Sequence, residues 1–175
     1  RIVAGAMRAL WGERIDVEDL WKNTFCVATN YSSASEVVLR RGDLFDTLLA
    51  SAAIPGALPP VVQDGELLCD GGTFNNFPVD VMRGMRGVGH VIGADISAPP
   101  PRRIEATEVP GTLALLRDRL RPKASRRYRF PSLVAYLMNI TVMYSLSRAG
   151  RARELTDLCF NPPLPRVGML QWKRF

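Results

Sequence analysis

The chain has 175 residues, of which 47% are apolar and 23% charged, and its formal net charge is +6. This length and balance predict a globular chain with one hydrophobic core and exclude an arrangement of two full domains. The sequence contains neither an internal repeat nor a low-complexity tract.

The cysteines and the histidine argue against a disulfide framework or a metal site. Cys26, Cys69 and Cys159 are far apart, odd in number and flanked by apolar residues, which is typical of buried reduced thiols. We therefore expect a cytoplasmic protein. His90 is the only histidine and no Cys-x-x-Cys pair occurs, so we predict no metal and no other cofactor.

The positive charge is concentrated in one block between Arg102 and Arg129, which holds nine basic and three acidic residues. Such a block attracts anionic lipid headgroups by a screened Coulomb interaction that does not depend on sequence. A solvated basic loop is an equal alternative. Nucleic acid is not the expected partner, because no recognisable nucleic-acid-binding module accompanies the charge.

Apolar runs, turn residues and caps predict mixed α and β structure. The expected strands are residues 25–29, 36–39, 67–69, 91–94 and 158–160, and the expected helical segments are residues 1–10, 17–21, 44–52, 78–85, 113–120 and 133–146. Asp43 is the expected N-cap of the helix at 44–52. Asp64-Gly65 between two apolar runs predicts a hairpin. Residues 133–146 are apolar at 11 of 14 positions, which predicts a buried helix too short to span a bilayer.

Asp70 is the main candidate for chemistry. It follows the apolar run Leu67-Leu68-Cys69 and precedes Gly71 and Gly72, so its carboxylate is expected at the carboxyl end of a strand, where open α/β sheets place their sites. The two glycines remove side-chain bulk and are expected to leave room beside the carboxylate. Asp-Gly-Gly alone is weak evidence, since such tripeptides commonly form turns.

The wider order of motifs resembles the patatin-like phospholipases, especially neuropathy target esterase and its bacterial relatives. The segments that carry the resemblance are Asp19-Leu20-Trp21, residues 25–29, residues 49–56 with Pro59-Pro60, Asp70-Gly71-Gly72, Asn75-Asn76-Phe77-Pro78 and Gly93-Ala94-Asp95. It covers residues 10–97 well and extends loosely to Asn161-Pro162-Pro163, Gly168 and Phe175. Asn30 departs from the aspartate common in relatives, at a position that is not catalytic in that family.

The resemblance implies a three-layer α/β/α fold with a mainly parallel central sheet. The chain starts at Arg1 without an initiator methionine and is expected to be a C-terminal fragment whose N-terminal half is missing. The expected parts are residues 1–98 as the C-terminal portion of the catalytic domain, 99–130 as a basic surface insertion, and 131–175 as a closing helix and last strand.

The resemblance also implies a lipid acyl hydrolase with a Ser-Asp dyad and no catalytic histidine. Asp70 matches the dyad aspartate, and Asn75 and Asn76 are expected to organise the supporting loop and cap the helix after Pro78. The family's Gly-x-Ser-x-Gly elbow and glycine-rich oxyanion loop do not occur in this chain, so the isolated chain is expected to be inactive. The implied substrates are phospholipids or lysophospholipids, and the expected location is the cytoplasm, with peripheral contact at a membrane surface as the further option.

Several residues compete with this assignment. Asp95 also ends an apolar strand, but no Gly-Gly follows it. A Cys69 nucleophile with His90 is disfavoured, because no spacing supports that pair, and Ser35 and Ser51 do not lie in an elbow motif. A further alternative is a truncated, non-catalytic homologue whose basic face binds anionic lipid or a protein.

Overall fold

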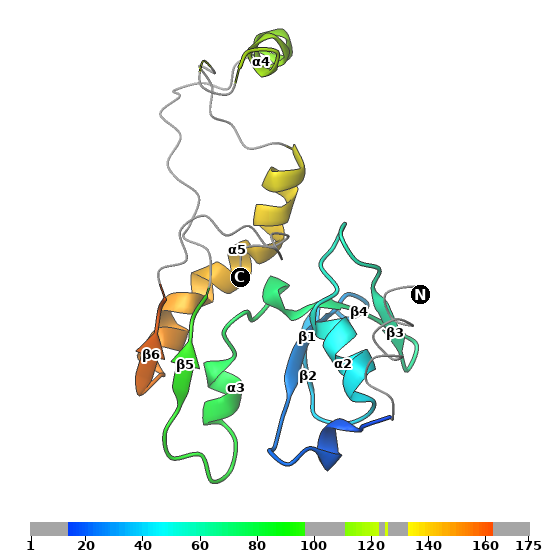
Figure 1. Ribbon diagram of the computed structural model, residues 1–175, viewed down its shortest axis with the longest axis vertical. Helices are drawn as coiled ribbons and strands as arrows, with labels where there is room; N and C mark the ends of the chain where they lie inside the picture. Colours follow the sequence, from blue (N-terminus) through cyan, green and yellow to red (C-terminus); the bar gives the residue numbers. More distant parts are fainter. Residues whose placement is uncertain (1–13, 97–110, 123–124, 126–132, 163–175) are drawn as a thin grey trace. The chain divides into compact units, whose positions relative to one another are not determined.

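The computed structural model describes residues 14–96, 111–122, 125 and 133–162 (Figure 1). The chain divides into two compact units, one formed by Arg1–Ala98 with Thr141–Phe175 and the other by Pro99–Ile140. The expected helix at residues 1–10 and the C-terminal part of the resemblance at residues 168 and 175 lie outside the described residues.

The first unit contains a four-stranded sheet in the order β2-β1-β4-β3. Its strands are β1 (Cys26–Asn30), β2 (Ser35–Leu39), β3 (Val61–Gln63) and β4 (Glu66–Asp70), and a short 3-10 helix, η1 (Val17–Asp19), precedes them. All three strand pairings are antiparallel, and Ala28 of β1 faces Asp70 of β4. The expected strands are therefore present within one or two residues of their predicted bounds.

The expected mainly parallel sheet is wrong for this part of the chain. β1 and β2 are joined by four residues, and β3 and β4 by Asp64-Gly65 alone. Parallel strands need a crossover of a dozen or more residues, so such short connections allow only antiparallel pairing. Asp64 and Gly65 both have positive φ, 51° and 80°, as a tight hairpin of this kind requires. The hairpin prediction is thus confirmed, and it conflicts with the parallel arrangement that the resemblance implied.

One helix, α2 (Leu44–Ser51), packs against β1, β3 and β4 (Figure 1). Asp43 is its N-cap, as predicted, and Asp43 Oδ1 accepts a hydrogen bond from the Asp46 N–H at 3.0 Å. The buried side chains between helix and sheet form a small apolar core of Ala28, Leu39, Ala50 and Leu68. This core fixes β4, and therefore the position from which Asp70 leaves the sheet.

The same unit contains a second, parallel sheet of two strands, β5 (Ile92–Ala94) and β6 (Leu158–Phe160). Between β4 and β5 lie η2 (Gly71–Thr73) and α3 (Val79–Arg83). A second apolar core joins Phe77, Val79, Val91 and Ala152, so the prediction of a single hydrophobic core is wrong. The expected buried strand at 91–94 is only half buried, because Val91 and Gly93 are covered while Ile92 is 69% exposed.

Two helices follow, α4 (Thr112–Arg119) and α5 (Leu133–Glu154). The expected helix at 113–120 is confirmed. The helix expected at 133–146 is also present, but its predicted burial is wrong. Its large apolar side chains are between 46 and 57% exposed at Tyr136, Leu137, Ile140, Met143 and Tyr144.

The buried positions of α5 are instead small residues, Ser145, Ala149 and Ala152. Their spacing of four and three residues places them on one face of the helix. Small side chains let a helix approach its neighbours closely, so this face packs within the first unit. Within the part of the chain that the structure describes, no helix is long and apolar enough to cross a membrane.

Candidate active site

The backbone of Asp70 is fixed on two sides at the end of β4. Its N–H donates to Ala53 O at 3.0 Å, just beyond α2, and its carbonyl oxygen accepts from Thr29 Oγ1 at 2.9 Å. Thr29 is buried on β1. A strand and the end of a helix therefore hold the main chain of Asp70.

The carboxylate of Asp70 has a simple environment. Oδ1 accepts a hydrogen bond from the Gly72 N–H at 2.8 Å, and no cation of the described residues lies within ion-pair distance of it. Burial raises the pKa of Asp70, and the Gly72 N–H opposes that rise. A half-buried carboxylate without a cationic partner accepts protons more readily than an ion-paired one, which suits a general base.

The two glycines that follow Asp70 have different roles. A Cβ at Gly71 would lie 2.1 Å from Val27 O, so this residue is needed for the close approach of η2 to β1. A Cβ at Gly72 would lie 3.1 Å from both Asp70 Oδ1 and Asn76 Oδ1. The expectation of open space beside the carboxylate is therefore wrong at both glycines, because the backbone of β1 fills the space at Gly71 and the side chains of Asp70 and Asn76 bound it at Gly72.

Asn75 makes hydrogen bonds within the loop and to two neighbouring elements, but the expected cap of the following helix is absent. Its N–H donates to Gly71 O at 2.8 Å, and its Nδ2 donates to Asp80 Oδ1 at 2.9 Å and to Glu36 Oε1 at 3.3 Å. α3 begins after Pro78 without a side-chain cap. The amide is used as a donor between two carboxylates because Asp80 and Glu36 both face the loop.

Asp95, the competing carboxylate, forms an ion pair with Arg153. It is 2% exposed, and Arg153 of α5 lies 2.7 Å from Asp95 Oδ2 through Nε and 2.5 Å through Nη2. A carboxylate held by a guanidinium in this way is engaged in a structural ion pair and is not open to a substrate. The geometry therefore favours Asp70 over Asp95.

The cysteine, histidine and serine side chains that compete for a catalytic role are each unsuited to it. Burial raises the pKa of the Cys69 thiol, and the charge of Asp70 raises it further, which makes a thiolate nucleophile unfavourable. His90 is 88% exposed at its side chain, and its Nδ1 lies 3.8 Å from Asp157. Ser51 Oγ donates to Val27 O at 2.8 Å, and Ser35 Oγ is paired with Ser33.

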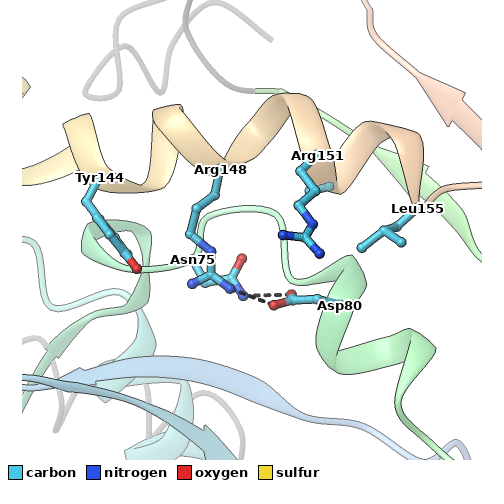
Figure 2. A pocket seen from close by; sticks show the side chains of 7 residues that line it. Asn75, Asp80, Tyr144, Arg148, Arg151 and Leu155 are labelled. Atoms are coloured by element: carbon cyan, nitrogen blue, oxygen red, sulfur yellow. Dashed lines mark hydrogen bonds and ion pairs between the residues drawn. The ribbon is translucent and has the colours of Figure 1, made fainter.

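The sequence did not reveal the part that α5 takes in the site. Ser145 Oγ accepts from the Asn76 N–H at 2.7 Å, and Arg148 reaches Asp80 and Glu36. Figure 2 shows Tyr144, Arg148 and Arg151 extending from α5 toward Asn75 and Asp80. These side chains line a cleft of about 420 Å³. A serine within a largely apolar stretch of helix was the signal in the sequence, because polar groups at such positions generally have partners.

Comparison with known proteins gives consistent results. The sequence model of the patatin-like phospholipase family matches residues 4–83. The patatin-like phospholipase domain-containing protein ZK370.4 of Caenorhabditis elegans is 31% identical over 179 residues, covering 97% of this chain and 13% of that protein. Lysophospholipase NTE1 of Candida albicans is 26% identical over 162 residues, covering 91% of this chain and 12% of that protein.

A shorter match reaches an insect protein. Neuropathy target esterase sws of Drosophila melanogaster is 34% identical over 86 residues, which cover 48% of this chain and 6% of that protein. The matched residues of the chain thus cover between 6 and 13% of the length of these three relatives.

Proposed function

We propose that Asp70 is the general base of a lipid acyl hydrolase, because residues 4–83 match the sequence model of the patatin-like phospholipase family. The observation that carries the proposal is the carboxylate itself. It leaves the end of β4 from a fixed backbone, lies beside Gly72, and has no cationic partner among the described residues.

The proposed reaction is transfer of an acyl group to a serine and then to water. The serine Oγ attacks the ester carbonyl carbon while its proton passes to the Asp70 carboxylate, which gives a tetrahedral oxyanion. The carbon–oxygen bond to the alcohol then breaks, and the proton on Asp70 passes to the leaving oxygen. In the second half, water attacks the acyl-serine, Asp70 takes a proton from that water, and the serine oxygen leaves and recovers a proton.

We propose that a further segment of the same polypeptide supplies the serine and the oxyanion-binding N–H groups. Two facts support this: no Gly-x-Ser-x-Gly occurs in the sequence, and the chain matches only 13% of the length of the nematode relative. Residues 1–98 and 131–175 would then belong to the catalytic domain, with 99–130 as a basic insertion. Without that segment, the chain by itself is expected to hydrolyse nothing.

The proposed substrates are phospholipids or lysophospholipids met at a cytoplasmic membrane surface. The names of the nematode and yeast relatives support the substrate class. The basic block between Arg102 and Arg129 supports attraction to anionic headgroups, because it holds six more positive than negative side chains.

The decisive experiment begins by sequencing the encoding gene upstream of the codon for Arg1. The complete gene product is then assayed with a short-chain ester and a fluorophosphonate probe. We expect the probe to label an elbow serine and Asp70→Asn to lower kcat by roughly 10³- to 10⁴-fold. Asp64→Asn is the matched control, because Asp64 also precedes a glycine but lies in the β3–β4 turn.

A product without an elbow serine that neither binds the probe nor cleaves esters would contradict the proposal. The remaining candidate would then be a non-catalytic homologue that binds anionic lipid through residues 102–129, which vesicle sedimentation measures directly. Wild-type turnover in the Asp70→Asn variant would remove Asp70 from the mechanism while leaving the hydrolase assignment in place.

A further inference from the structure

The loop of residues 71–76, which follows Asp70, is hydrogen-bonded to α5 through its last residue. The Asn76 N–H donates to Ser145 Oγ at 2.7 Å, across 69 residues of sequence. Ser145 is 5% exposed, so water cannot easily replace its oxygen as the acceptor. The bond therefore fixes the position of Asn76 relative to the helix.

Arg148, less than one turn further along α5, joins the same loop to two other elements. Its Nη2 lies 2.6 Å from Asp80 Oδ2 on α3, and its Nη1 lies 3.1 Å from Glu36 Oε2 on β2. The same Nη1 makes a longer contact of 3.4 Å with Phe74 O in the loop. One guanidinium thus bridges two carboxylates and a loop carbonyl, as its fork of donors allows.

The near end of the loop holds the carboxylate of Asp70. Gly71 O accepts from the N–H groups of Phe74 and Asn75, at 3.1 and 2.8 Å, and the Gly72 N–H donates to Asp70 Oδ1 at 2.8 Å. The residues from Gly71 to Asn76 are thus one hydrogen-bonded unit between Asp70 and α5. We therefore expect a shift of Asn76 to move the Gly72 N–H.

We propose that Ser145 and Arg148 are positioning residues for Asp70, acting through the loop of residues 71–76. This inference rests on the proposed function of Asp70 as a general base. The two side chains do not touch the carboxylate; they hold the loop whose Gly72 N–H orients it. Errors of about 1 Å in a reacting group can lower turnover by about 100-fold, so such support matters to the reaction.

The hydrogen bond from Gly72 also affects the proton affinity of Asp70. It is the interaction that opposes the effect of burial on the pKa of Asp70. The titratable neighbour among the described residues is the Cys69 thiol on the same strand, which stays neutral because its pKa is raised. A displaced loop would weaken the bond from Gly72, so the pKa of Asp70 would rise further.

The test compares three serine variants in the complete gene product, with active sites counted by fluorophosphonate labelling carried to completion. Ser145→Ala removes the acceptor, Ser145→Thr retains an oxygen, and Ser147→Ala is the matched control. Ser147 is exposed on the same helix, and its hydroxyl donates to Tyr144 O within that helix.

We expect Ser145→Ala to lower kcat per labelled site about 10- to 100-fold with little change in KM, and to move the acid limb of kcat/KM to higher pH. Ser145→Thr should recover most of kcat, and Ser147→Ala should behave as the unmodified protein. Arg148→Met, which retains the length of the side chain but removes the charge, should shift the acid limb in the same direction.

Three outcomes separate failure of this inference from failure of the proposed function. If the unmodified protein cleaves esters in an Asp70-dependent manner but Ser145→Ala keeps its kcat and pH profile, the positioning role is wrong. If Ser145→Ala loses activity only in proportion to its loss of labelled sites, the role is structural and the inference is again wrong. If the unmodified protein has no Asp70-dependent activity, the proposed function itself fails.

Discussion

Two aspartates at strand ends differ in what surrounds their carboxylates. Asp95 is almost fully buried and binds Arg153, while Asp70 is half buried and accepts one hydrogen bond from Gly72. A structural ion pair needs the first arrangement and a base needs the second. In sequence both follow an apolar strand, and the Gly71-Gly72 pair after Asp70 favoured it over Asp95; the geometry separates them more clearly.

The first prediction concerns pH and Asp70. Because burial raises the pKa of Asp70 in the folded protein, the folded state binds its proton more tightly than the unfolded state does. The stability from this group is thus fully present below the ordinary carboxyl pKa of about 3.9 and is lost as pH rises through the raised value. Asp70→Asn should therefore raise Tm at pH 7, and the gain should shrink toward pH 3. A Tm difference that does not depend on pH would contradict this.

The second prediction compares the two glycines after Asp70. Gly71→Ala places a Cβ 2.1 Å from a backbone oxygen of β1, and we expect it to cost about 3 kcal/mol or more in the free energy of unfolding. Gly72→Ala meets only the ends of side chains at 3.1 Å, so it should cost less than about 1 kcal/mol. It should nevertheless lower kcat by about 10-fold or more by displacing the carboxylate. Denaturant unfolding and ester turnover, measured on both variants, decide between these outcomes.

Among the elements, α2 shows how far local sequence signals extend. Asp43, the apolar run after it and Pro55 with Gly56 predicted its start and end, and the structure has α2 at Leu44–Ser51. The β3–β4 hairpin was equally readable from Asp64-Gly65. In both cases residues adjacent in sequence make the deciding interaction.

The third prediction concerns the cap of α2. Asp43→Ala removes the acceptor of the Asp46 N–H, and we expect a loss of about 1 kcal/mol in the free energy of unfolding. Asp43→Ser keeps a capping oxygen and should lose little of that stability. Equal losses for the two variants in urea unfolding would show that the cap bond contributes nothing.

The parts of the fold and site that sequence could not supply depend on partners far along the chain. The burial of α5 was predicted wrongly because its large apolar residues, such as Leu137 and Met143, are exposed while Ser145 and Ala149 are buried. Apolar content alone does not say which face of a helix is covered. The contacts of Ser145 and Arg148 with the loop span about 70 residues, so the local pattern around Ser145 could indicate a buried polar group but not its partner.

At the scale of the whole molecule, the carboxylate of Asp157 links the elements that surround the second apolar core of the first unit. Asp157, just before β6, accepts from the Val91 N–H and from Arg83 Nη2 of α3, both at 2.6 Å. The Val91 N–H, together with Arg83, lowers the pKa of Asp157. Asp157 therefore joins α3, β5 and β6 through charge-assisted hydrogen bonds.

The fourth prediction follows from this lowered pKa. The stabilisation that ionised Asp157 gives the folded state is present above the ordinary carboxyl pKa of about 3.9. It is lost as pH falls through the lower pKa of Asp157 in the folded state. Asp157→Asn should therefore lower Tm at pH 7 and have little effect at pH 2, opposite in sign to Asp70→Asn. Asp64→Asn serves as the exposed control, and a Tm loss that persists at pH 2 would contradict the expected dependence on ionisation.

The distance in sequence between the sheet and α5 also sets an order of events during synthesis. β1 to β4 and α2 all lie between Cys26 and Asp70, so the ribosome completes them before it reaches Ser145. Chains begin to fold from the N-terminal side as they emerge. The strand β4, which carries Asp70, can therefore pair early. The loop of residues 71–76 gains its contacts with α5 only after α5 has been synthesised. A nascent chain stalled before residue 145 would contain the formed sheet, but the loop beside Asp70 would lack its hydrogen bond to Ser145.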